Sequence, residues 1–147
     1  MSPRLYRAAA LLAGLAGCSG LMTYPNDAPK NVHVVTQTDR GVRAALHVHA
    51  VNRDCATHYD GTLALDRANL DVGVPAHRPS YLVVSFDTSS FMAGSRATSV
   101  GTLLTPRPGH EYELAVRYKQ DIYDVALREI DRKGVRRDLA RQPLAGC

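Results

Sequence analysis

The sequence lacks the short motifs by which many enzymes are recognised. It has no Gly-x-Ser-x-Gly elbow, no His-Glu-x-x-His pair, no glycine-rich phosphate loop and no calcium-loop spacing. It shows no internal repeat, and after its first 17 residues no apolar run approaches the ~20 residues that a membrane-spanning helix needs. We therefore expect a protein that is not an enzyme, that holds no cofactor and that has no transmembrane helix.

Basic side chains only slightly outnumber acidic ones. The chain carries 18 basic and 14 acidic side chains, and two of the basic ones, Arg4 and Arg7, stand at its start. The densest basic spot is Arg136-Arg137, which a solvated turn or strand end explains. This balance predicts no nucleic-acid partner, and the length fits one domain with enough residues to bury a core.

The first 18 residues follow the order basic, apolar, small. Arg4 and Arg7 stand in a stretch without acidic residues, residues 8–16 read AAALLAGLA, and Leu15-Ala16-Gly17-Cys18 ends the pattern. This order is typical of a secretory signal peptide, and its apolar run is too short to span a bilayer. The last four residues resemble the lipobox of bacterial lipoproteins.

The resemblance implies a lipid anchor at Cys18. In that family the cysteine sulfur takes a diacylglyceryl group, the signal is cut just before the cysteine, and the new amino group is usually acylated. Two or more acyl chains hold a protein on a membrane, whereas one binds weakly and reversibly. Ser19 follows, where aspartate would favour the inner membrane, so the resemblance implies the outer membrane. The alternative is an ordinary secretory signal in which Cys18 has no special role.

The number of cysteines also bears on whether Cys18 is lipidated. Three cysteines, Cys18, Cys55 and Cys147, leave one thiol over in an exported protein. If Cys18 is lipidated, the other two remain to form one disulfide, as exported cysteines usually do. In the loop-entropy model, closing such a long loop is worth about 4.5 kcal/mol. The alternative is that Cys55 and Cys147 are two free thiols.

The predicted organisation has three parts. Residues 1–17 form the signal peptide, residues 18–30 a lipidated tether, and residues 31–147 a single domain. The tether is inferred from its composition, which includes Pro25, Asn26, Asp27 and Pro29.

From residue 31 onward the dominant hydrophobic period is two, which indicates strands. The clearest case is residues 110–119, where tyrosines and aliphatic residues alternate mainly with charged ones. The predicted strands cover residues 32–37, 42–50, 62–66, 81–87, 100–104, 110–119, 123–127 and 135–139. About six to eight short strands without a helical pattern predict an all-β fold, a small antiparallel β-sandwich of immunoglobulin-like or transthyretin-like type.

Register follows from the rule that paired residues point to the same face of a sheet. Tyr118 and Tyr123 both stand in inward rows, so they are predicted to pair across a two-residue loop, Gln120-Asp121. With Tyr112, they are expected to belong to the core, and the alternative is that this tyrosine row lines a ligand groove.

The same argument gives a candidate metal site. If residues 32–37 and 42–50 form a hairpin with Thr38 opposite Val42, His33 faces His47, and His49 lies two residues further on that face. Three neutral imidazoles suit zinc, copper or nickel. The alternative is three histidines that face solvent on a polar sheet face.

Together these features predict an outer-membrane-anchored lipoprotein whose β-sandwich faces the periplasm. It would meet the membrane through its lipid and a protein of the cell envelope through a sheet face or loop, in binding or scaffolding. Two further functions stay open. One is an inhibitor or immunity protein that neutralises a periplasmic enzyme, and the other is a metal-binding lipoprotein that uses the three histidines.

Overall fold

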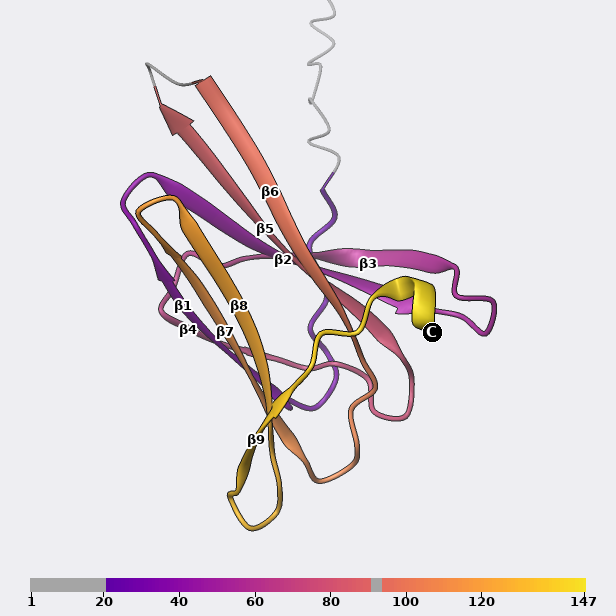
Figure 1. Cartoon of the computed structure of the whole chain (residues 1–147). Helices are drawn as coiled ribbons and strands as arrows, with labels where there is room; N and C mark the ends of the chain where they lie inside the picture. Colours follow the sequence, from indigo (N-terminus) through magenta and orange to yellow (C-terminus); the bar gives the residue numbers. More distant parts are fainter. Residues whose placement is uncertain (1–20, 91–93) are drawn as a thin grey trace, which may run out of the picture.

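The computed structural model describes residues 21–90 and 94–147. Within these ranges the chain forms nine β-strands and one short 3-10 helix (Figure 1). No helix in this described part is long and apolar enough to span a membrane. The strands are β1 (Val32–Thr38), β2 (Val42–Val51), β3 (Thr57–Ala64), β4 (Asn69–Val72), β5 (Ser80–Ser90), β6 (Gly94–Leu104), β7 (Glu111–Lys119), β8 (Ile122–Ile130) and β9 (Arg136–Leu139), followed by the helix η1 (Leu144–Gly146).

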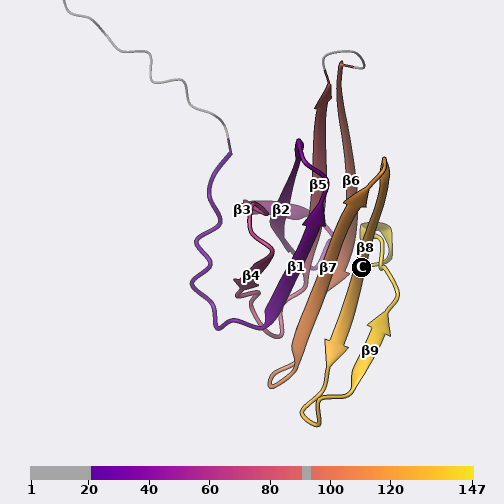
Figure 2. The ribbon, with the colours of Figure 1, turned by 90° about the vertical axis from the view of Figure 1, so that its left-hand side faces the viewer.

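The strands form two sheets that pack face to face (Figure 2). The first sheet has the order β4-β1-β7-β8-β9, and the second has the order β3-β2-β5-β6. β1 and β7 are parallel, and the other neighbouring strands are antiparallel. The prediction of a small all-β sandwich is therefore confirmed. The prediction missed β4, because its four residues, Asn-Leu-Asp-Val, are too few to show a period.

The alternating rows identified in the sequence form the core between the sheets. Each fully buried aliphatic or aromatic side chain of this kind contributes about 1.5–3 kcal/mol to folding. Tyr112 and Tyr118 belong to this core, as predicted, whereas Tyr123 remains 44% exposed. The largest fully buried side chains are those of Tyr112, Phe86, Leu46, Leu82, Leu114, Val32, Val34, Val48, Val72, Val74, Val84 and Val116.

The β7–β8 hairpin has the predicted register. Tyr118 pairs with Tyr123, and the two loop residues, Gln120 and Asp121, have φ values of 51° and 61°. Positive φ at both central residues matches the twist of the flanking strands, although asparagine and glycine are the usual residues there. The carboxylate of Asp39 accepts a 2.7 Å hydrogen bond from the backbone N–H of Gln120, which holds the loop in this conformation.

The predicted hairpin of the first two strands is wrong. β1 pairs with β4 and β7 in the first sheet, whereas β2 pairs with β3 and β5 in the second. Residues 39–41 therefore cross from one sheet to the other, and Val42 lies opposite Thr88 rather than Thr38. Alternation determines which residues face the core but not which strand is the partner, because a crossing between the sheets also buries the even-numbered residues of both strands.

The predicted tether boundary is also wrong, because the domain begins before residue 31. Thr23 forms a parallel bridge with Thr62 of β3, and Tyr24 is 7% exposed in the core, with its hydroxyl donating to the carbonyl of Gly73 at 2.8 Å. Two glycines permit this close approach. A Cβ on Gly61 would lie 2.5 Å from the backbone of Tyr24, and one on Gly73 would lie 2.0 Å from the carbonyl oxygen of Ala28.

The predicted disulfide is confirmed. Cys55 and Cys147 are bonded, with their Cα atoms 5.7 Å apart and 92 residues apart in sequence. The bond joins the β2–β3 connection to the C-terminal segment, which runs back from β9 across the sandwich (Figure 1).

Candidate functional site

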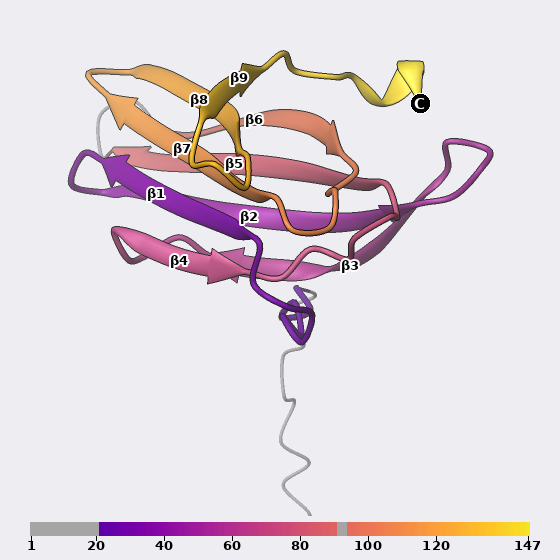
Figure 3. The ribbon, with the colours of Figure 1, turned by 90° about the horizontal axis from the view of Figure 1, so that it is seen from below.

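The two ends of the described chain lie on opposite sides of the sandwich. Residues 22–31 pack beside β3 and β4, whereas the segment that follows β9 runs along the side where β6 and β8 lie (Figures 2 and 3). We call this second side the β6–β8 side. Two cavities open on it, one at each end of β6.

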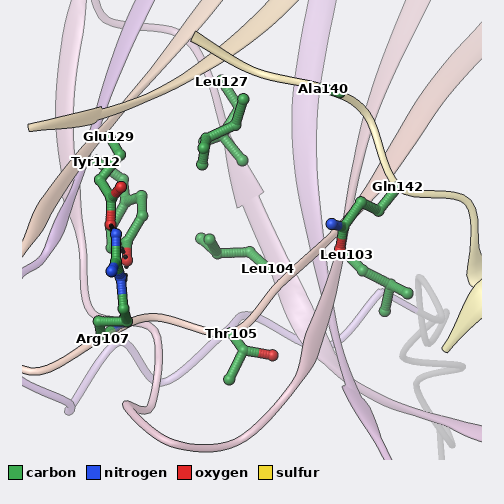
Figure 4. A pocket seen from close by; sticks show the side chains of 10 residues that line it. Leu103, Leu104, Thr105, Arg107, Tyr112, Leu127, Glu129, Ala140 and Gln142 are labelled. Atoms are coloured by element: carbon green, nitrogen blue, oxygen red, sulfur yellow. Dashed lines mark hydrogen bonds and ion pairs between the residues drawn. The ribbon is translucent and has the colours of Figure 1, made fainter. Parts of the chain in front are cut away.

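The first cavity, the leucine pocket, has a volume of about 330 Å³. Glu129, Tyr112 and Arg107 lie along one wall, with Leu104 and Leu127 in the middle and the amide of Gln142 on the opposite side (Figure 4). It is lined by Leu103, Leu104, Thr105, Arg107, Tyr112, Leu127, Glu129, Leu139, Ala140 and Gln142. The pocket therefore combines an apolar floor with one charged wall, a combination that suits binding.

Glu129 is the central residue of that wall. Its side chain is 6% exposed, and one carboxylate oxygen accepts hydrogen bonds from Nε of Arg107 at 2.9 Å, from Nη2 of Arg107, and from the Tyr112 hydroxyl at 3.3 Å. Nδ1 of His110 lies 3.1 Å from the same oxygen, although not in the geometry of a hydrogen bond. The hydrogen bonds from Arg107 hold the pKa of Glu129 below its usual range. The carboxylate is therefore ionised and paired, so it is not set up to donate a proton.

Sequence reasoning missed this site, although a signal for it was present. Glu129 continues the inward row of Tyr123, Val125 and Leu127 on β8, so it is a charged residue at a core-facing position. A buried carboxylate requires a partner, because leaving it unpaired is costly. That partner is Arg107, whose position in the β6–β7 connection could not be placed from periodicity.

The second cavity, the aromatic pocket, has a volume of about 340 Å³ and lies at the other end of the β6–β8 side. The ring of Phe86 lies 5.4 Å from that of Tyr118 and 5.9 Å from that of Tyr123, between centroids. Arg96 of β6 and Asp121 of the β7–β8 loop also line the pocket. Tyr112 and Tyr118 thus belong to the core, as predicted, and Tyr118 also lines this pocket together with the exposed Tyr123, as the alternative prediction of a tyrosine-lined groove had it.

The three histidines predicted to bind a metal do not meet. His33 lies in the first sheet, where Nδ1 is 2.6 Å from Asp71 and Nε2 is 3.5 Å from Glu111. His47 and His49 lie in the second sheet. No group of three or more histidine, cysteine, aspartate or glutamate side chains gathers as a metal site within residues 21–90 and 94–147. The prediction was wrong because it depended on the β1–β2 hairpin.

His47 instead links three strands of the second sheet. Its Nδ1 lies 2.6 Å from the hydroxyl of Thr62 on β3, and its Nε2 lies 2.8 Å from the hydroxyl of Ser85 on β5. Burial lowers the pKa of His47, which keeps the imidazole neutral. A serine hydroxyl beside an imidazole is the arrangement of a catalytic nucleophile and its general base, but in such sites a carboxylate orients the imidazole from its other nitrogen. In His47 that other nitrogen, Nδ1, lies against the hydroxyl of Thr62 instead. These contacts therefore connect β2 to β3 and β5 and stabilise the second sheet.

Cys18, the predicted lipidation site, lies outside the described residues. The lipobox reading thus remains a prediction from the sequence.

Comparison with known proteins adds only a likeness of fold. No family model matches the chain, and no curated protein matches it. A crystal structure of transthyretin from Sparus aurata is similar with a TM-score of 0.49 and 14% identity, covering 69% of this chain and 98% of that one. Sea bream transthyretin in complex with thyroxine is similar with a TM-score of 0.47 and 15% identity, covering 66% of this chain and 93% of that one.

Proposed function

We propose that this protein is a lipid-anchored binding module of the bacterial envelope. Cys18 carries the anchor, in the outer membrane as Ser19 implies, and the β-sandwich binds a periplasmic or membrane protein through its β6–β8 side. The observation that carries this proposal is the position of the N-terminal segment, which packs beside β3 and β4, on the side opposite β6 and β8 (Figure 3).

The docked segment limits how far the domain can move from the membrane. Cys18 and Met22 are four positions apart in the sequence, and an extended chain of that length spans at most about 14 Å. The carbonyl of Met22 already accepts a 2.8 Å hydrogen bond from the backbone N–H of Thr62. An anchor at Cys18 would therefore hold the β3–β4 side near the lipid and leave the β6–β8 side facing away from it.

The chemistry of the β6–β8 side favours binding. The carboxylate of Glu129 is neutralised by Arg107 within the pocket wall, and the aromatic pocket presents rings from two sheets at one rim. Apolar pockets with few polar groups provide surface for a ligand and orient it, which is what a binding module needs.

The anchor is tested by the intact mass of the protein recovered from bacterial membranes. A chain that begins at Cys18 and carries acyl groups is the expected result, and Cys18→Ala is expected to move the protein to the soluble fraction. A mature chain that starts elsewhere or carries no lipid would remove the anchor from the proposal.

The orientation is tested on the lipidated protein in vesicles that carry nitroxide-labelled headgroups. A fluorophore attached at Asp27→Cys, on the β3–β4 side, is expected to be quenched more strongly than one attached at Ser99→Cys on β6. Equal quenching at the two positions would contradict the fixed orientation.

A further inference from the structure

The four sheet edges of this sandwich are protected to very different degrees. An open edge strand exposes unpaired backbone groups and invites pairing with another chain, so proteins shorten, charge or cover such edges. β4 and β9 have four residues each, and β9 contains Arg136, Arg137 and Asp138. The edge of β3 is covered by the N-terminal segment through the bridge between Thr23 and Thr62.

β6 has none of these protections along most of its length. It is 11 residues long, pairs with β5 without interruption, and begins with the small residues and single charge of Gly-Ser-Arg-Ala-Thr-Ser. Residues Gly94–Ala97 and Ser99 are exposed. Within the described residues, β6 is therefore the long edge left without a cover or a charged outer rim.

The backbone groups that β6 offers follow from its pairing with β5. The N–H of Leu103 points away from β5, because it donates a 2.9 Å hydrogen bond to the carbonyl of Gln142 in the C-terminal segment. In an antiparallel ladder, every second residue turns both its N–H and its C=O away from the neighbour. Ala97, Ser99 and Gly101 therefore present their backbone groups outward, in line with Leu103.

The contact with Gln142 shows that an outward N–H of this edge already bonds to the backbone of another segment. The chain's own C-terminal segment occupies the position at Leu103, and the hydroxyl of Thr102 accepts a hydrogen bond from the N–H of Gln142 at 3.1 Å. The positions at Ala97, Ser99 and Gly101 continue the same line beyond that contact.

We propose that an extended segment of a partner protein pairs with β6 at Ala97, Ser99 and Gly101 and enters the aromatic pocket with one of its side chains. Main-chain hydrogen bonds then give affinity, and pockets for alternate side chains give specificity. The inference rests on the proposed binding function but not on the lipid anchor.

The pockets identify the kind of segment. A strand added to β6 points every second side chain toward the space between the sheets, as Thr98 and Val100 of β6 do. The position beside Thr98 opens on the aromatic pocket, whose rim includes Tyr118 and Tyr123. A segment that alternates apolar and polar residues, with an aromatic or long aliphatic side chain at that position, fits this site.

A second copy of this chain fits less well. In a β6–β6 pair, the inward side chains that one copy would offer the other are those of Arg96, Thr98 and Val100, none of which is aromatic or a long aliphatic chain that would fill the aromatic pocket. The cavity of about 340 Å³ would remain open. A foreign segment with a large side chain fills it and pairs with the same backbone groups.

The test uses the full-length protein in detergent micelles and a display library of random linear peptides as the probe. Selected peptides are expected to alternate apolar and polar residues, and a synthetic copy of the best is measured by fluorescence anisotropy. Methylating alternate backbone nitrogens of this peptide is expected to weaken binding at least tenfold, in the register that faces β6, and methylating the other nitrogens is expected to have little effect.

Ser99 offers a matched pair of variants. Ser99→Pro removes an outward N–H that no other strand in the described part of the chain uses, which an edge strand tolerates, and it is expected to weaken peptide binding at least tenfold. Ser99→Ala keeps the N–H and is expected to bind like the wild type.

Three outcomes would overturn the inference: no peptide selected, equal affinity for Ser99→Pro and Ser99→Ala with no effect of peptide methylation, or a wild-type dimer in light scattering that Ser99→Pro dissociates. The third would identify the second copy as the occupant. If the protein recovered from membranes carries the lipid but selects no peptide, only this inference fails. If it carries no lipid but binds peptides at β6, only the lipid anchor fails.

Discussion

Nε of Arg107 donates a 2.9 Å hydrogen bond to the buried carboxylate of Glu129, and this contact ties the β6–β7 connection to β8. We expect Glu129→Gln to lower the free energy of unfolding, since the amide loses the charge that Arg107 neutralises. Charge-assisted hydrogen bonds contribute about 1.5–3 kcal/mol, and Arg107 is more than half exposed, so screening by solvent reduces the expected loss to about 1–2 kcal/mol. Urea unfolding near neutral pH measures it.

The pH dependence of the same variant provides its control. Hydrogen bonds from Arg107 lower the pKa of Glu129 in the folded protein, so the unfolded state binds more protons at acid pH. The stability that Glu129 contributes is present above its unfolded pKa and is lost as the pH falls through the folded pKa. The difference in stability between wild type and Glu129→Gln should therefore narrow as the pH falls below the unfolded pKa of about 4.3. A difference that stays constant as the pH is lowered well below that value would contradict the assignment.

The Cys55–Cys147 disulfide is expected to hold the cover of the leucine pocket in place. Ala140 and Gln142, which line that pocket, belong to the segment that the bond ties to the β2–β3 connection. The double variant Cys55→Ser, Cys147→Ser should lose about 2–4 kcal/mol of unfolding free energy. Hydrogen exchange at the N–H of Leu103 should also accelerate, because its acceptor is the carbonyl of Gln142.

Reductant supplies the matching measurement on the wild type. Reduced wild type should resemble the double variant in urea unfolding and in exchange at Leu103. Faster global unfolding with unchanged local exchange at Leu103 would show that the C-terminal segment stays in place without the bond.

The histidines His33 and His47 should affect stability with opposite dependence on pH. The hydrogen bond to Asp71 raises the pKa of His33, so its contribution is full below the unfolded pKa of 6.5 and is lost as the pH rises through the folded pKa. Burial lowers the pKa of His47, so its contribution is present above 6.5 and is lost as the pH falls.

Single variants separate the two histidines. His33→Gln should cost more stability at about pH 5 than at about pH 8, and His47→Gln should cost more at about pH 8. Urea unfolding at both values measures each difference. The same pH trend in both variants would mean that the contacts of Asp71 or of Thr62 and Ser85 do not control these side chains in solution.

The sequence predicts strands more reliably than it predicts their partners. Alternation placed Tyr118 opposite Tyr123 and the tyrosine–valine rows in the core, because period two directly reports which face is buried. It failed at residues 39–41, where a short link fits both a hairpin and a crossing between sheets. The Glu129 site was not predicted, because its partner Arg107 lies in a loop, where apolar residues do not recur at a fixed spacing.

The docking of the N-terminal segment on the domain was not predicted for a different reason. Its composition is that of a linker, and its attachment depends on one aromatic side chain and on side-chain amides. Asn26 accepts from the N–H of Gly73 at 2.7 Å, and Asn31 accepts from the N–H of Val74 at 2.9 Å. Single anchoring residues of this kind produce no repeating pattern, so only the folded structure shows that the segment belongs to the domain.

Tyr24 provides the decisive test of that segment. Tyr24→Ala should cost about 3–5 kcal/mol, as buried aromatic residues do, whereas Tyr24→Phe should cost only about 1 kcal/mol for the hydrogen bond to Gly73. A free tether would make both variants neutral. Gly73→Ala checks the same docking from the opposite partner, because its Cβ would lie 2.0 Å from the carbonyl oxygen of Ala28.

The same variants connect docking to the proposed orientation. If Tyr24→Ala releases the segment, the lipid anchor is joined to the sandwich by roughly a dozen free residues, which reach up to about 40 Å. In vesicles with nitroxide-labelled headgroups, the fluorophore at Asp27→Cys should stay near the lipid, while a fluorophore introduced at Arg78→Cys, beside Asp60 of β3, should lose its quenching. Retained quenching at position 78 in Tyr24→Ala would mean that contacts other than the docked segment hold the β3–β4 side against the membrane.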